Sequence, residues 1–168
     1  MDTRWLDDDE RAAWLRLMAL VELLPGALDT QLRRDSSLSH FEYFVLAMLS
    51  EAPHRTLRMT QLGRLTNSTL TRLSHVSRRL EERGLIERFQ CPEDGRATNA
   101  TLTEKGWHTV VQAAPGHVGT VRATVLDALS PEQVDQLRAI ADAVLPRLDP
   151  DRRLAVLYDE SAPAEVHS

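Results

Sequence analysis

The stretch from Thr69 to Gly84 constrains the fold more than any other part of the chain. At 3.6 residues per turn, Leu73, Val76 and Leu80 fall on one face of a helix, and Gly84 ends it. The remaining faces carry polar and basic side chains, namely Thr71, Arg72, Ser74, His75, Arg78 and Arg79. Such a helix packs its apolar face on a core and presents its basic face to solvent or to a partner.

Short elements surround this basic helix. Local signals predict, in order, a helix at about 40–52, an extended piece at 56–58, a helix at about 59–65, and two strands at 85–91 and 97–102 joined by a turn at 92–95. Ser39 and Glu42 form an S-x-x-E capping box for the first helix, and Asn67-Ser68-Thr69 supplies the turn before the basic helix. The order of helix, turn, basic helix and hairpin predicts a winged helix-turn-helix.

Three longer helices flank this unit. They are expected over residues 10–34, from Thr103 onward, and from the capping box at 130–133 to about Pro146. Because proline removes a helix hydrogen bond, Pro25-Gly26 should bend or interrupt the first helix and Pro115-Gly116 should kink the second. Their apolar faces exceed what a small winged domain can cover, so we expect a two-fold partner to bury them. The alternative is a helical cap within one chain.

Charge is distributed unevenly along the chain. The formal net charge is −5, but residues 55–105 hold ten basic and six acidic side chains, which leaves −9 for the rest. A positive middle between negative ends points to an anionic partner. The acidic N-terminus lacks the pattern of a signal peptide, and no apolar run approaches the roughly 20 residues that cross a bilayer. We therefore expect a soluble, cytoplasmic protein without a membrane partner.

Double-stranded DNA is the anionic partner that this arrangement fits. The second helix of a helix-turn-helix can lie in the major groove, where arginine, serine, threonine and histidine bind base edges or phosphates. An arginine on a hairpin tip can enter a narrow minor groove. The candidate DNA-binding residues are Ser68, Thr69, Thr71, Arg72, Ser74, His75, Arg78, Arg79, Asp94 and Arg96. Asp94 is expected to hold Arg96 in position. For the helix alone, an ordinary solvated face is the alternative.

Residues from about 38 to 107 resemble the winged-helix core of the MarR (multiple antibiotic resistance regulator) family. The resemblance rests on Leu62–Thr69, Leu80–Arg88, Asp94-Gly95-Arg96 and Leu102–Gly106. It implies a bacterial homodimer whose recognition helices enter successive major grooves of a pseudo-palindromic operator and repress transcription. In many members a small ligand releases the DNA. One departure is His75, which lies where the family frequently has arginine.

The expected fold is mainly α with a small β-hairpin wing, in which dimerisation helices flank a winged helix-turn-helix. We divide the chain into four parts: an N-terminal dimerisation helix (1–37), the DNA-binding domain (38–103), C-terminal dimerisation helices (104–158) and a disordered tail (159–168).

A ligand pocket is the second candidate site. In the family that the chain resembles, it lies between the dimer helices and the winged domain. Aromatic rings and one polar handle could line it here for a small aromatic or phenolic effector, namely Trp14, His40, Phe41, Phe44 and Trp107. Plain core or interface packing is the alternative for each.

Catalytic and metal sites find no support in the residue pattern. The six histidines show no metal-ligand spacing, and neither a glycine-rich phosphate loop nor a nucleophile elbow is present. The single cysteine, Cys91, could be a redox switch or a structural, half-buried thiol. We expect no cofactor and no enzymatic activity. Two other functions stay open: a winged-helix module for protein–protein contacts without DNA binding, and a small enzyme that uses the histidines.

Overall fold

The chain folds into helices with one small sheet, and the structure, a computed structural model, describes residues 3–92 and 94–159. In chain order the elements are α1 (Asp8–Ser36), α2 (His40–Glu51), β1 (Thr56–Arg58), α3 (Met59–Leu65), α4 (Leu70–Glu82), β2 (Ile86–Gln90), β3 (Thr98–Leu102), α5 (Glu104–Thr124) and α6 (Pro131–Leu148). Short 3₁₀ turns lie at Pro53–Arg55, Leu126–Ala128 and Ala155–Leu157. This arrangement confirms the expected fold class. The predicted tail from 160 onward lies outside the described residues.

Side-chain caps fix where the helices begin. Ser39, Thr69, Thr103 and Ser130 each accept a hydrogen bond from the backbone N–H three residues later, at distances between 3.0 and 3.3 Å. Asp7 makes the same contact at 2.8 Å, which starts α1 two residues earlier than predicted. These caps satisfy N–H groups that have no partner within the helix.

Pro25 and Pro115 do not interrupt the helices that contain them. α1 continues across Pro25 and α5 across Pro115. The carbonyls that proline leaves without an N–H partner belong to the residues four positions earlier, Val21 and Val111. Both of these residues are exposed, so water can bind the freed carbonyls. The interruption that was one of the two expectations for Pro25-Gly26 is therefore not found, and α1 is one helix from Asp8 to Ser36.

The sheet has three antiparallel strands in the order β1-β3-β2. Ile86 of β2 pairs with Leu102, and Leu57 of β1 pairs with Ala100 on the other side of β3. The extended piece predicted at 56–58 is thus the third strand of the sheet. The sheet and α2 to α4 enclose one apolar core, whose fully buried members include Leu46, Leu49, Leu62, Leu73, Leu80 and Ile86.

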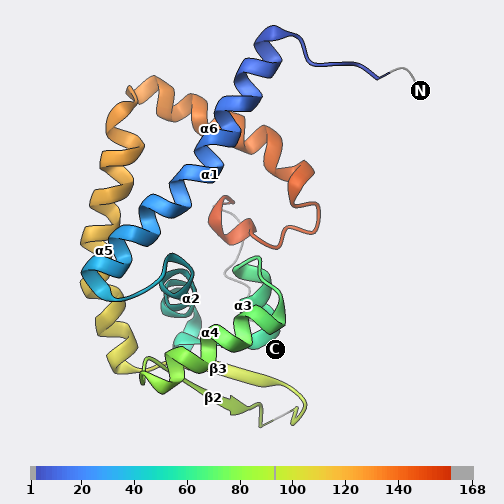
Figure 1. Ribbon diagram of the computed structural model, residues 1–168. Coiled ribbons are helices and arrows are strands. Elements are labelled where there is room, and N and C mark those ends of the chain that lie inside the picture. The colour runs from blue at the N-terminus through green and yellow to red at the C-terminus, as the bar shows by residue number, and fades with distance from the viewer. Residues whose placement is uncertain (1–2, 93, 160–168) are drawn as a thin grey trace.

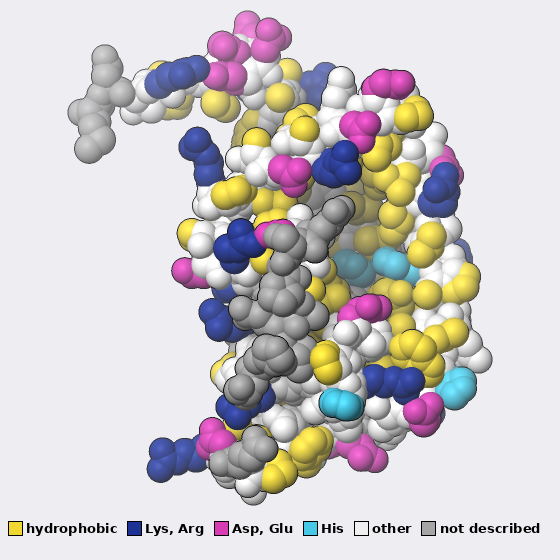
Figure 2. Space-filling model, turned by 180° about the vertical axis from the view of Figure 1, so that it is seen from behind, with side chains coloured by type: hydrophobic (Ala, Val, Ile, Leu, Met, Phe, Trp, Pro, Cys, Tyr) yellow, Lys and Arg dark blue, Asp and Glu magenta, His cyan; other side chains and the backbone are white. Residues whose placement is uncertain are grey.

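α1, α5 and α6 extend away from this winged unit (Figure 1). α1 and α5 pack along each other, with Leu28, Leu32 and Ala113 buried. None of the residues of α6 is buried within the part of the chain that the structure describes. Hydrophobic side chains lie on the surface over these three helices, in the upper half of Figure 2. Among the described residues, no helix is long and apolar enough to span a membrane.

Candidate nucleic-acid interface

The outward face of α4 is polar and basic. Its inward face is buried through Leu73, Val76 and Leu80, with Ser77 beside them, as the helical period predicts. The candidate positions of this helix all reach the surface: Thr71, Arg72, His75, Arg78 and Arg79 are exposed, and Ser74 is half-buried. The helix can therefore present these side chains to a macromolecule without unfolding any part of the core.

The turn between α3 and α4 is held by its own hydroxyls. Asn67 takes the left-handed backbone conformation, with φ of 46°. The hydroxyl of Ser68 lies 3.1 Å from that of Thr66, and Thr69 caps α4. Ser68 and Thr69, two of the candidate DNA-binding residues, thus make hydrogen bonds within the turn. Each hydroxyl keeps a lone pair for a further contact.

An open hollow of about 440 Å³ lies beside this turn. Two arginines line it, Arg64 from α3 and Arg153 from the segment after α6, together with Thr60, Gly63 and residues 67–70. Arg153 is not part of the predicted site, because 83 positions of sequence separate it from Leu70 and no local pattern brings them together. The hollow adjoins the N-terminal end of α4, where the helix dipole favours an anion, and the guanidinium of Arg153 lies 3.6 Å from the carboxylate of Asp149.

Two side chains of α2 each contact one arginine of α4. The guanidinium of Arg72 lies over the ring of Phe41, 4.1 Å from its centroid. A guanidinium nitrogen of Arg79 lies 3.4 Å from a carboxylate oxygen of Glu42. The sequence pattern did not show either contact, because both join residues about 30 to 40 positions apart.

Asp94 contacts a different arginine side chain from the one expected. It accepts a hydrogen bond from the backbone N–H of Arg96 at 3.2 Å, and its carboxylate lies 3.8 Å from the guanidinium of Arg58. Arg58 immediately precedes α3, so this ion pair joins the hairpin to the helix-turn-helix. Arg96 itself is exposed at the tip. Asp94 therefore contacts Arg96 through the backbone N–H, and the side-chain partner of Asp94 is Arg58.

Arg88 at the base of the hairpin contacts α4. Its guanidinium donates to a carboxylate oxygen of Glu81 at 2.7 and 3.1 Å, and its backbone N–H donates to the other oxygen at 3.0 Å. The hydrogen bond from the side chain of Arg88 lowers the pKa of Glu81 most, and the backbone hydrogen bond adds to this effect. The pair fixes the hairpin relative to α4, and it leaves Arg88 engaged within the protein.

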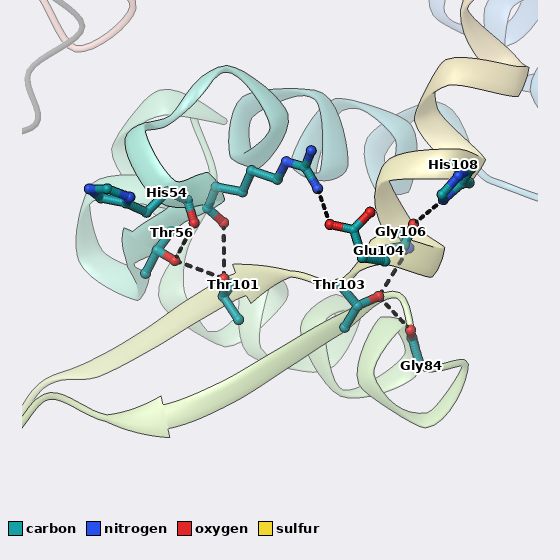
Figure 3. A network of polar contacts seen from close by, with 9 residues as sticks. His54, Thr56, Gly84, Thr101, Thr103, Glu104, Gly106 and His108 are labelled. Atoms are coloured by element: carbon teal, nitrogen blue, oxygen red, sulfur yellow. Dashed lines mark hydrogen bonds and ion pairs between the residues drawn. The ribbon is translucent and has the colours of Figure 1, made fainter.

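Figure 3 shows further contacts at the base of the hairpin, where α4 ends and α5 begins. The hydroxyl of Thr103 donates to the carbonyl of Gly84 at 2.7 Å and accepts from the N–H of Gly106 at 3.0 Å. Arg55 donates to the Glu104 carboxylate at 2.8 Å. These contacts tie the end of α4, the start of α5 and the residues before β1 into one rigid unit.

The five residues predicted to line a ligand pocket do not form one group within this chain. Trp14 is 50% exposed and precedes the end of α1 by 22 residues, about 33 Å along the helix. Phe41 lies under Arg72, and Trp107 lies under Arg55 at 4.2 Å. Aromatic faces attract guanidinium groups, so these two rings face the winged unit rather than a common cavity.

The structure instead gathers His40, Tyr43 and His117 where α1, α2 and α5 meet. The His117 ring stacks on His40 with centroids 6.2 Å apart and lies 4.7 Å from the ring of Tyr43. Burial lowers the pKa of both histidines, and the charge of His40 lowers that of His117 further. His117 Nδ1 and the side-chain oxygen of buried Gln31 have no hydrogen-bond partner among the described residues.

Possible metal ligands and the single cysteine were the remaining candidate sites. Within residues 3–92 and 94–159, no three histidine, cysteine, aspartate or glutamate side chains gather as metal ligands. Cys91 is buried, and its sulfur lies 4.0 Å from the guanidinium of Arg58. The burial of Cys91 favours the structural alternative for the thiol, whereas a neighbouring guanidinium favours a thiolate.

Comparisons with known proteins agree with this geometry. The model of the MarR family matches residues 38–98. The transcriptional repressor MprA of Escherichia coli K12 is 29% identical over 107 residues, which are 64% of this chain but only 60% of MprA. The match therefore spans less than two thirds of that relative.

Solved structures match over a larger share of the chain. Sco3205 from Streptomyces coelicolor, a MarR family transcriptional regulator solved in complex with DNA, is 41% identical and superposes with a TM-score of 0.85. The match covers 89% of this chain and 93% of Sco3205. AbsC from the same organism, also a MarR family transcriptional regulator, is 35% identical with a TM-score of 0.81, over 89% of this chain and 99% of AbsC. The chain therefore belongs to the MarR family of transcriptional regulators and is not an enzyme.

Proposed function

We propose that the chain binds operator DNA through α4 and the hairpin and thereby represses transcription. The observation that carries this proposal is the one-sided packing of α4, which buries its apolar face and leaves five polar or basic side chains exposed. The Sco3205 complex with DNA and the name of the repressor MprA support it. In this arrangement α4 enters the major groove, and Arg96 enters the adjacent minor groove.

The active form in this proposal is a homodimer. α1 and α6 expose large apolar side chains that a winged unit does not cover, among them Trp14, Leu20, Leu137, Ile140 and Val144. Exposed apolar area of this extent marks an interface. A two-fold axis through these helices would set the recognition helices about 34–36 Å apart, one turn of DNA. The parts 1–37, 38–103 and 104–158 then serve as dimer helix, DNA-binding domain and dimer helices.

A small aromatic ligand that releases the DNA completes the proposal. Its site would be the cluster of His40, Tyr43 and His117 rather than the set with Trp14 and Trp107 that the sequence suggested. Gln31 Oε1 and His117 Nδ1, two of the three buried side-chain atoms that lack a hydrogen-bond partner among the described residues, support this placement, because a ligand could satisfy them.

DNA fragments selected from genomic DNA by the wild-type protein test the proposal directly. We expect one enriched pseudo-palindrome, with affinity that falls steeply as salt rises because phosphate contacts release counterions. Arg96→Ala should weaken binding to all sequences and reduce the salt slope by about 1. Arg72→Ala should cost about 1–3 kcal/mol and relax base preference at one position.

Arg138→Ala is the matched control, because this exposed arginine lies on α6. Its operator affinity in a mobility-shift titration should equal that of the wild type. If no fragment is enriched, the winged-helix module for protein contacts becomes the better account of the chain.

A further inference from the structure

The first turn of α2 contacts two different parts of the molecule. Phe41 and Glu42 contact the arginines of α4, whereas His40 and Tyr43 contact His117 of α5. The four residues are consecutive, so one helical turn touches both the DNA-facing helix and the helices that carry the exposed apolar faces.

Phe41 offers Arg72 a fixed platform. Its ring is half-buried and packs against the apolar core, which restrains it. A guanidinium over such a ring is held by cation–π attraction. An arginine that is already oriented loses less side-chain entropy when it binds a base or a phosphate than an arginine that hangs free in solvent.

Glu42 fixes Arg79 in a comparable way. Glu42 is only 7% exposed, and its other carboxylate oxygen accepts a hydrogen bond from the backbone N–H of Ser39 at 2.7 Å. The capping box therefore immobilises this carboxylate before it meets Arg79. The side chain of Arg79 is 62% exposed, so further N–H donors of its guanidinium face outward for DNA.

The same turn is anchored to α1. Asp29 accepts a hydrogen bond from the backbone N–H of His40 at 2.9 Å, and Asp29 is itself held by Arg33 at 2.5 Å. A shift of α1 or α5 would consequently move the backbone that carries Phe41 and Glu42.

We propose that Phe41 and Glu42 are positioning residues, which orient Arg72 and Arg79 for base recognition without touching DNA. The placement of α1 and α5 then sets the geometry of the DNA-facing arginines through the first turn of α2. This inference rests on the proposed DNA-binding function.

The test compares operator and non-specific DNA in mobility-shift titrations, with the operator obtained from wild-type selection. Phe41→Leu keeps an apolar side chain but removes the aromatic face, and Phe41→Tyr keeps the face. We expect Phe41→Leu to lower the ratio of operator to non-specific affinity about two- to fivefold. Phe41→Tyr should have the same ratio of operator to non-specific affinity as the wild type. A loss of stability alone would weaken binding to both DNAs equally and leave the ratio unchanged.

A double-mutant cycle makes the assignment specific. In an Arg72→Ala background, Phe41→Leu should have no further effect on the ratio, because the side chain that it orients is gone. An equal effect in both backgrounds would overturn the role of Phe41.

Glu42→Gln tests the second pair while keeping the helix cap, since glutamine also serves in a capping box. We expect the affinity ratio to fall about two- to fivefold, with non-specific affinity unchanged or higher because one negative charge is lost. Glu51→Gln, the same change at the exposed far end of α2, should match the wild type. An unchanged ratio for Glu42→Gln would overturn the role of Glu42. Wild-type protein that enriches no DNA would instead overturn the proposed function and this inference with it.

Discussion

Gly106 lies at the point where the start of α5 touches the residue that leads into β2. A Cβ atom built there would stand 2.7 Å from the Leu102 side chain and closer still to the carbonyl oxygen of Leu85. Backbone atoms cannot move aside as a flexible side chain can. Because Gly106 has no side chain, α5 can begin in direct contact with the hairpin. The Thr103 cap then fixes this contact.

Gly106→Ala should destabilise the fold by about 1–3 kcal/mol or more, because overpacking forces the backbone to shift. Urea denaturation followed by circular dichroism measures this difference. Gly119→Ala on the same helix is the control, since a Cβ there meets nothing within 4 Å among the described residues. It should instead stabilise the protein by about 0.5–1 kcal/mol. Equal effects of the two substitutions would contradict the packing argument.

The sequence predicts the starts of the helices well and the pairings between distant segments poorly. Ser39, Thr103 and Ser130 mark helix starts because a cap involves only the next three residues. The pairing of β1 with β3 joins residues as far apart as Thr56 and Thr101, 45 positions along the chain, and no local pattern contains it. The exposed face of α4 follows from its helical period, but its contacts with Phe41 and Glu42 require the folded arrangement of two helices.

The contact between α2 and α5 predicts a dependence of stability on pH. Burial lowers the pKa of both His40 and His117, so near pH 6 the unfolded chain binds more protons than the folded one. Stability is then complete above the ordinary histidine pKa and falls as the pH drops below about 6.5. Asp29 opposes part of the effect, because its charge favours protonated His40.

We expect the melting temperature to fall between pH 7.5 and pH 5.5, and His117→Gln to reduce this fall. Thermal melts in matched buffers measure it. His108→Gln, on the exposed face of α5, should keep the wild-type dependence. If His117→Gln melts with the same dependence as the wild type, the pair does not control stability in this range.

The helices that extend from the winged unit carry most of the exposed apolar side chains of the described residues. These side chains lie on α1, α5 and α6, over which basic side chains are also found (Figure 2). α6 shows this most clearly, because Leu137, Ile140 and Val144 share one face and stay exposed in the single chain. A helix that its own chain does not bury needs another surface to cover it.

Ile140→Glu should convert the proposed dimer to a monomer. Ile140 is 63% exposed in one chain, and a glutamate at this position would place a charge in the proposed interface. Sedimentation equilibrium measures the mass. Ala139→Glu adds the same charge about a quarter turn away along the helix and should remain dimeric. The winged unit should stay folded in both variants, as shown by unchanged helix content, because α6 contributes no residue to its core.

The same variant predicts how the operator is bound. A dimer that holds two recognition helices at one turn of DNA binds both half-sites with a single loss of translational freedom, whereas a monomer binds each half-site separately. Ile140→Glu should therefore weaken binding to the full operator by about 10²-fold or more, while its affinity for an isolated half-site stays close to that of the wild type. Titration of both DNAs separates these effects. A monomeric variant that binds the full operator as tightly as the wild type would show that dimerisation through α6 is not what aligns the two α4 helices.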